Sequence, residues 1–183
     1  MPRVLWVSSL ERVALLFALL ALAALALLLG RPSFTNASRP PRFGNAMLAI
    51  QFARDVQDVD WILGDAPSPD REVMRVKQYV DFGFIACYTG LFLALSALAV
   101  RKRGWRRVAG IAAGICGLAT AAFDIVENRA ILILLDVPLR ATTPAMLHAI
   151  RAPGAAKWIL AGVTVVLLVL SLIPFSRTHE STH

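Results

Sequence analysis

Polar side chains interrupt an otherwise apolar stretch of the chain, residues 108–135, at four positions within six residues. These positions are Asp124, Glu127, Asn128 and Arg129. An ionised side chain near the centre of a bilayer costs roughly 2.5–3.5 kcal/mol on insertion scales, so such groups need polar partners. Carboxylates and an amide grouped in this way could bind a small polar molecule, hold a proton, or act together as an acid and a base.

Read as a helix, the same stretch has one face of small and polar residues. The residues of this face are spaced 4, 3, 4, 3 and 4 apart: Gly110, Gly114, Gly117, Ala121, Asp124 and Asn128. A Gly-xxx-Gly pattern allows a second helix to approach closely. We therefore expect Asp124 and Asn128 to point into protein rather than lipid, with Glu127 on the flank of the face.

Asp81 and Lys157 stand at the outer ends of two other apolar stretches, residues 80–100 and 157–175. Asp124 lies sixteen residues after the start of its own stretch, about 24 Å along a helix that rises 1.5 Å per residue. In a hydrocarbon core about 30 Å thick, this is the outer third, the depth expected for Asp81 and Lys157. We therefore expect Lys157 to be the counter-ion of Asp124.

Two further residues complete the predicted polar cluster. Tyr88 follows Asp81 by seven residues and so shares its helix face, and Gln51 lies in the connection between the first two apolar stretches. Arg129 points away from the small-residue face and is expected to extend outward to water. Buried polar groups also hold membrane helices together, at about 0.6 kcal/mol each, so a purely structural role for the cluster stays open.

The composition places the chain among integral membrane proteins. Of its 183 residues, 57% are hydrophobic and 17% are charged, and the mean hydropathy is +0.64. A soluble domain of this length has no core large enough to bury so much apolar surface. The net charge of +7 does not indicate a nucleic-acid partner, because the basic residues flank apolar stretches and no soluble domain remains to present them.

No set of histidine, cysteine and carboxylate residues has the spacing of a metal site, and the sequence indicates no cofactor. Cys87 and Cys116 lie inside apolar stretches, where isolated cysteines usually serve as small core side chains. His148 is interpreted as a loop residue. The polar cluster is therefore the principal candidate for a functional site.

These patterns predict an all-α fold: an integral membrane four-helix bundle that residues 1–183 form as a single domain. The expected spans are residues 13–29, 80–100, 108–135 and 157–175. Between the last two spans, residues 142–156 are expected to form a loop with a turn at Pro153 and Gly154.

One additional helix is expected in the connection between the first two spans, over residues 47–63. Its apolar residues fall on one side: Leu48, Phe52, Val56, Val59, Ile62 and Leu63. The segment is too polar to cross the membrane, and Gly64 ends it. We therefore expect an interfacial amphipathic helix that covers the polar cluster.

The orientation is predicted from the connection between the second and third spans. Residues 101–107 contain five basic residues, and dense short basic loops remain in the cytoplasm. Four spans then place both termini in the cytoplasm, as expected for a multi-pass protein of a bacterial inner membrane. The total number of lysines and arginines is slightly higher on the opposite side, so the orientation depends on the density of this one loop.

Four short motifs occur in order along the chain. They are Met47-Leu-Ala-Ile-Gln-Phe-Ala53, Val80-Asp-Phe-Gly-Phe-Ile-Ala-Cys-Tyr88, Phe123-Asp-Ile-Val-Glu-Asn128 and Lys157-Trp158. Together they resemble a group of small four-span bacterial membrane proteins, which share an Asp-Phe pair, an Asp-x-x-Glu-Asn motif and a lysine that opens the last span. The resemblance covers roughly residues 45–172. It supports the polar cluster and implies no particular activity, and the chain departs from it at Gln51, where the group often has glutamate.

Three functions remain compatible with the sequence, in descending order of preference. The first is binding or transport of a small polar molecule, a proton or a lipid headgroup, although four spans without an inverted repeat offer little room for transport. The second is an accessory subunit whose polar residues pair with another membrane protein. The third is a membrane-embedded enzyme that uses Asp124 and Glu127 as acid and base on a lipid-like substrate. Against the enzyme, the sequence shows no nucleophile–base pair and no phosphate loop.

Overall fold

The computed structural model describes residues 8–30, 32–34 and 45–172. Its helices, in chain order, are α1 (Ser9–Leu29), α2 (Ala46–Gln51), α3 (Val56–Leu63), α4 (Pro69–Val100), α5 (Trp105–Leu135), the short 3-10 helix η1 (Leu139–Ala141) and α6 (Pro144–Leu172). No strand occurs in these three ranges, so the all-α prediction is confirmed. The end of the predicted fourth span, residues 173–175, and both predicted cytoplasmic termini lie outside the described residues.

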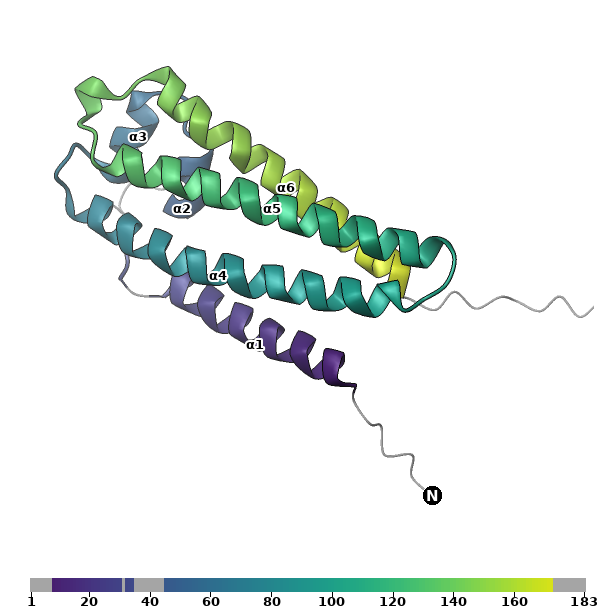
Figure 1. Cartoon of the computed structure of the whole chain (residues 1–183). Coiled ribbons are helices and arrows are strands. Elements are labelled where there is room, and N and C mark those ends of the chain that lie inside the picture. The colour runs from purple at the N-terminus through teal and green to yellow at the C-terminus, as the bar shows by residue number, and fades with distance from the viewer. Residues whose placement is uncertain (1–7, 31, 35–44, 173–183) are drawn as a thin grey trace, which may run out of the picture.

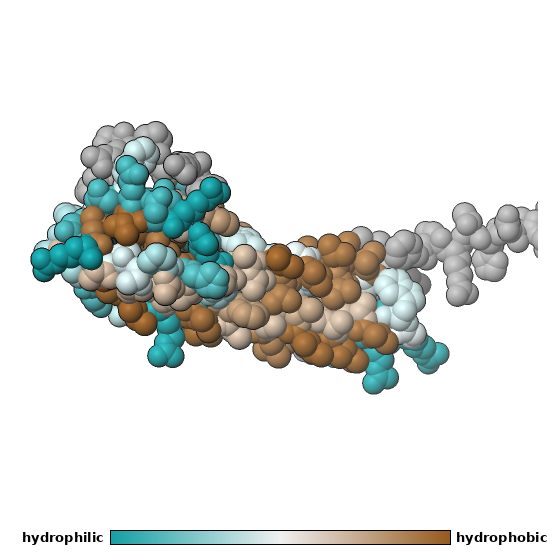
Figure 2. All heavy atoms as spheres, turned by 90° about the horizontal axis from the view of Figure 1, so that it is seen from above, coloured by the Kyte–Doolittle hydropathy of each residue, from teal (hydrophilic) through white to brown (hydrophobic). Residues whose placement is uncertain are grey.

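Helices α1, α4, α5 and α6 form the four-helix bundle. Each is long and apolar enough to cross a membrane, so the chain is a multi-pass membrane protein. Helix α1 packs along α4, and α5 packs between α4 and α6 (Figure 1). The start of α1, the end of α6 and the α4–α5 loop lie at one end of the bundle, with α2 and α3 at the other. Figure 2 shows apolar side chains along the bundle and hydrophilic ones gathered at the end that carries α2 and α3.

The small-residue face of α5 packs against α4. A methyl group on Gly110 would lie 2.6 Å from the Cβ atom of Ala99, and one on Gly117 would lie 3.1 Å from the Cβ atom of Phe92. Side chains larger than hydrogen would force the two helices apart at these positions. The close approach that the glycine spacing predicts is therefore present, and α4 is the helix that makes it.

The single interfacial helix predicted over residues 47–63 is wrong, because the segment forms two short helices. Helix α2 ends at Gln51, and α3 starts at Val56, with Asp55 as its N-cap. The Asp55 carboxylate accepts a hydrogen bond from the amide of Asp58 at 2.9 Å. Such a cap favours a new helix start over continuation of the previous helix. Phe52 lies in the break and is exposed, so it does not belong to the buried face.

The loop predicted over residues 142–156 is also wrong, because α6 begins at Pro144 and Pro153 stands inside it. A proline within a helix removes one backbone hydrogen bond and costs about 3 kcal/mol. Pro153 and Gly154 are both buried, and Gly154 faces Glu127 of α5. Packing between α6 and α5 therefore outweighs the local preference for a turn. His148 consequently lies on a helix and is exposed to the surroundings.

Helix α4 begins at Pro69, eleven residues before the predicted second span. The Ser68 hydroxyl accepts a hydrogen bond from the amide of Arg71 at 3.3 Å, and Pro69 occupies the first turn, as at many helix starts. The sequence predicts a span only from residue 80 and assigns no helix to the polar residues 69–79. They are helical because the helix continues past the apolar part of the bundle.

Helix α1 marks the level of one membrane boundary. Its 21 residues span about 32 Å, close to the thickness of about 30 Å of a hydrocarbon core. At its end, Lys77 of α4 donates hydrogen bonds from Nζ to the carbonyl oxygens of Leu28 (2.5 Å) and Gly30 (2.9 Å). We therefore take the level of Lys77 as this boundary, and the preceding residues of α4 extend beyond the end of α1.

The part of the protein beyond this boundary has a hydrophobic core of its own. We call this part the cap; it comprises α2, α3, η1 and the adjoining ends of α4, α5 and α6. Its buried core residues are Ile50, Ala53, Val59, Leu63, Met74, Ile131, Leu134, Leu135, Leu147 and Ile150. Helices α2 and α3 thus pack on protein and cover the end of the bundle.

Candidate functional site

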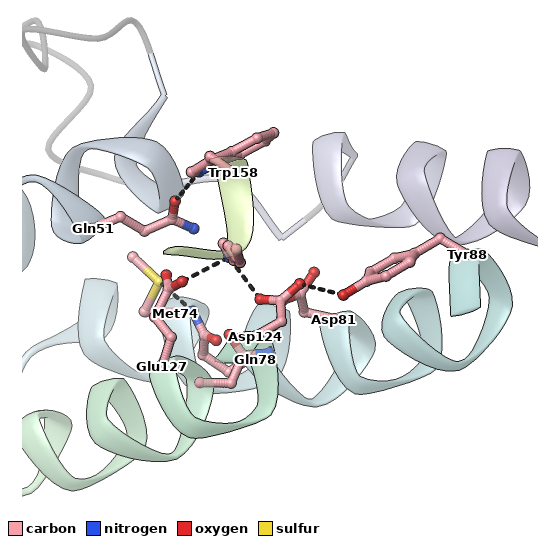
Figure 3. A network of polar contacts seen from close by, with 10 residues as sticks. Gln51, Met74, Gln78, Asp81, Tyr88, Asp124, Glu127 and Trp158 are labelled. Carbon is pink, nitrogen blue, oxygen red and sulfur yellow. Dashed lines mark hydrogen bonds and ion pairs between the residues drawn. The ribbon is translucent and has the colours of Figure 1, made fainter. Parts of the chain in front are cut away.

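An ion-paired lysine lies between α5 and α6, just beneath the cap. The Nζ atom of Lys157 is 2.6 Å from Oδ1 of Asp124 and 2.8 Å from Oε2 of Glu127 (Figure 3). All three side chains are buried, and Glu127 is completely inaccessible. One ammonium group therefore holds two carboxylates that lie on adjacent turns of α5. The predicted pairing of Lys157 with Asp124 is present, and the pairing with Glu127 adds to it.

Helix α4 contributes the second layer of this cluster. The Tyr88 hydroxyl donates a hydrogen bond to Oδ2 of Asp124 at 3.0 Å, and Nδ2 of Asn128 donates one to Oδ2 of Asp81 at 2.7 Å. Both oxygens of Asp124 thus have partners, one from α4 and one from α6. The structure brings these residues together in one buried network, drawn in Figure 3.

Two of the residues that the sequence singles out lie at the edge of the network. Gln51 accepts a hydrogen bond at Oε1 from Nε1 of Trp158 at 3.1 Å, and this bond joins α2 to α6 directly above Lys157. Gln51 therefore belongs to the cover of the cluster rather than to its charged centre. Arg129 is exposed, in agreement with the expectation that it extends outward.

Gln78 belongs to the same network and escapes the sequence prediction. It lies on the α4 face that also carries Met74, Asp81 and Tyr88, at spacings of 4, 3 and 7. Its Nε2 atom donates only a long contact to the Met74 sulfur, at 3.5 Å. The polar face could have been extended to residue 78 from the sequence, because Ser68-Pro69 is a recognisable helix start.

Two buried residues of the network retain acceptor atoms without a hydrogen bond. Among the described residues, nothing donates a hydrogen bond to Oε1 of Gln78 or to Oε1 of Glu127. The other carboxylate oxygen of Glu127 has the ion pair with Lys157 and no aligned hydrogen bond. An unpaired buried acceptor costs about 1–3 kcal/mol, so these atoms are unusual for a cluster with only a structural role.

The cluster lies close to the membrane boundary rather than in the middle of the bilayer. Asp81 follows Lys77 by four residues, which places it about 6 Å below the boundary. The cluster therefore sits where the apolar bundle meets the cap.

Cationic side chains of neighbouring helices bind the C-terminal carbonyl groups of three long helices. Arg71 of α4 donates from Nη1 to the carbonyl oxygens of Leu134, Leu135 and Val137 at the end of α5, at 2.9–3.1 Å. Lys77 does the same for α1, and Arg106 donates from Nε to the carbonyl oxygen of Ser171 in α6 at 2.8 Å. None of these helices has a basic residue in its own last turn. Because a helix C-terminus attracts positive charge, this lack is the feature of the sequence that indicates a cation from another helix.

Asp65 joins two connections within the cap. Its Oδ1 atom accepts hydrogen bonds from the backbone amides of Leu139 and Ala66, both at 2.8 Å. The amide of Leu139 contributes most to holding the pKa of Asp65 below its usual range, because these bonds favour the charged carboxylate. The α3–α4 connection is thereby tied to the start of η1.

Within the described ranges, no three histidine, cysteine or carboxylate side chains are arranged to hold a metal ion. Comparison with family models, curated proteins and solved structures found no match to this chain. The chemistry of the cluster is therefore inferred from its own geometry. The cluster contains one ammonium group and three carboxylates, and two of its acceptor oxygens have no donor among the described residues.

Proposed function

We propose that this protein binds a small polar molecule or a lipid headgroup at the buried cluster of Asp81, Asp124, Glu127 and Lys157. The observation that carries the proposal is that Glu127, completely buried, keeps one oxygen without a hydrogen-bond partner among the described residues. Where a buried polar contact serves only to hold helices together, its donor and acceptor groups are both hydrogen-bonded. Here the helices meet and a buried acceptor oxygen still has no partner among the described residues, which supports a binding role.

The enzyme alternative is less well supported by the geometry. Both oxygens of Asp124 are engaged, one by Lys157 and one by Tyr88. Of this pair, Glu127 alone keeps an acceptor oxygen without a partner among the described residues, whereas acid–base chemistry of the kind considered needs two carboxylates that can each exchange a proton. An accessory role would require a partner protein on the apolar outer faces of the bundle, which lipid also covers.

We also propose that the protein resides in a bacterial inner membrane, with the cap on the outer side. The α4–α5 loop is rich in Arg and Lys and lies at the same end of the bundle as the start of α1 and the end of α6 (Figure 1). Dense basic loops are retained in the cytoplasm, so this end would face inward. The resemblance to four-span bacterial membrane proteins supports the same location.

Native mass spectrometry of the protein extracted gently from membranes tests the binding function. We expect an additional bound mass on the wild type that is absent from Glu127→Gln, because the variant removes the charge at the vacant acceptor while keeping its shape. Asp136→Asn is the matched control, since it changes an exposed carboxylate directly after α5 that is ion-paired with Arg75. An unliganded wild type, or equal retention in all three proteins, would contradict the proposal.

A further inference from the structure

The atoms that lack partners in the cluster are all acceptors. Oε1 of Glu127 and Oε1 of Gln78 belong to side chains that are 0% and 1% exposed, and neither has a donor among the described residues. Lys157 is the cation of the network, and it is already within 2.8 Å of two carboxylates. A ligand that completes this site must therefore supply hydrogen-bond donors.

The charge of the cluster also restricts the kind of ligand that can bind. Asp81, Asp124 and Glu127 are three carboxylates around a single lysine, and Arg129 of α5 is exposed rather than buried with them. Buried carboxylates without compensating positive charge are unfavourable in a medium of low dielectric constant. A ligand that also carries positive charge would reduce this imbalance, whereas an anionic ligand would increase it.

Helix α6 packs closely against the carboxylate. Gly154 faces Glu127, and a methyl group at this position would lie 3.2 Å from its Oε2 atom. Together with Lys157 one turn further along, Gly154 forms the α6 side of the site. A compact group is therefore more compatible with this position than a branched one.

We infer that the ligand of this site is a protonated primary amine, bound through its N–H groups to the vacant oxygens of Glu127 and Gln78. A primary ammonium is compact, carries one positive charge and has three N–H donors, whereas a quaternary ammonium has the charge but no donor. This inference rests on the proposed binding function and specifies the chemical class of its ligand.

Two sources could supply such an amine. One is a lipid with a primary-amine headgroup, because the site lies about 6 Å below the boundary marked by Lys77, within reach of a headgroup. The exposed Trp158 beside Lys157 is typical of side chains at that level. The other is a free small amine that enters from the aqueous side.

Two measurements on the wild-type protein are sufficient to test the inference. Delipidated protein is mixed with phosphatidylethanolamine or with phosphatidylcholine of the same acyl chains, and bound lipid is counted by native mass spectrometry. Separately, thermal unfolding is recorded in ethylammonium chloride and in tetramethylammonium chloride at equal ionic strength. We expect the primary-amine member of at least one pair to bind about tenfold more tightly, since one charge-assisted hydrogen bond contributes at least that factor.

Preference in the lipid pair identifies a headgroup, and preference in the salt pair identifies a free amine; either result supports the inference. Equal behaviour within both pairs overturns it, and a bound mass of another kind that Glu127→Gln abolishes would leave the broader binding function standing. In the variants, Glu127→Gln and Gln78→Met should lose the preference. Asp136→Asn, which alters an exposed carboxylate directly after α5, should retain it.

Discussion

Gly154 of α6 faces Glu127 of α5 so closely that a methyl group on the glycine would lie 3.2 Å from the carboxylate. Glu127 has little freedom to withdraw, because its Oε2 atom is 2.8 Å from Lys157. The position of α6 against α5 and the position of the buried carboxylate therefore depend on each other. Pro153, which the sequence suggests as a turn, lies in the same buried stretch of helix.

Gly154→Ala should accordingly lower the thermal stability of the protein in detergent. Alanine is favoured over glycine within a helix by about 1 kcal/mol, but here its methyl group would have to displace Glu127 from Lys157. Gly162→Ala is the matched control on the same helix, because nothing lies within 4 Å of a methyl group there. We expect the control to match or exceed the wild-type melting temperature; a Gly154→Ala variant of equal stability would show that Glu127 moves freely.

Arg71→Met should destabilise the protein by about 3 kcal/mol, since it leaves several buried carbonyl oxygens at the end of α5 without donors. Arg71 is 1% exposed, and its guanidinium also binds the carbonyl oxygen of Gly64 at 3.0 Å. Arg75→Met, one turn further along α4, removes ion pairs with the exposed carboxylates of Glu72 and Asp136 and should cost less than about 1 kcal/mol. Chemical unfolding of the two variants measures the difference, and similar losses would refute the helix-end role of Arg71.

Asp65 gives the stability of the cap a dependence on acid pH. Its pKa is lowered from 3.8 chiefly by the amide of Leu139, so its contribution is complete above that value and disappears as the pH falls through the lower, folded-state pKa. Asp65→Asn should therefore be less stable than the wild type at neutral pH, and the difference should shrink below pH 3.8. Melting curves across this range provide the measurement, and a difference independent of pH would contradict the role.

The orientation of the bundle can be tested with single cysteines. A cysteine replacing Trp105, next to the basic loop, should react with a membrane-impermeant thiol reagent only after the cells are opened. A cysteine replacing Thr143, at the start of α6 in the cap, should react in intact cells. Both native cysteines are first changed to alanine, and Cys87 and Cys116 lie within helices that cross the membrane. The opposite labelling pattern would place the cap in the cytoplasm.

The sequence predicts those features that depend on the periodicity of one helix. The glycine face of α5 and the direction of Asp124 follow from spacings of 3 and 4, and no knowledge of other helices is needed. The pairing with Lys157 could also be predicted, because depth in a membrane can be counted along each helix. These expectations agree with the structure.

Features that depend on packing between segments could not be predicted in this way. Pro153 and Gly154 form a turn by local preference, and only burial against α5 keeps them helical. Residues 69–79 are too polar for a membrane span, and they are helical because the cap lies outside the membrane. Gln78 belongs to this extension of α4, and its place on the polar face follows from the sequence only once the helix start at Ser68-Pro69 is recognised.

The most direct test of the cluster is a set of combined substitutions at Lys157, Asp124 and Glu127. Lys157→Met leaves two buried carboxylates without their cation; losing one partner of a buried pair costs about 3–5 kcal/mol, and water near the boundary should reduce this. Adding Asp124→Asn should recover only part of the loss, because Glu127 also contacts Lys157, at 2.8 Å. The triple variant with Glu127→Gln should recover most of it, since no orphan charge then remains. Thermal unfolding in detergent measures each step, and losses that simply add would show that the three side chains do not interact.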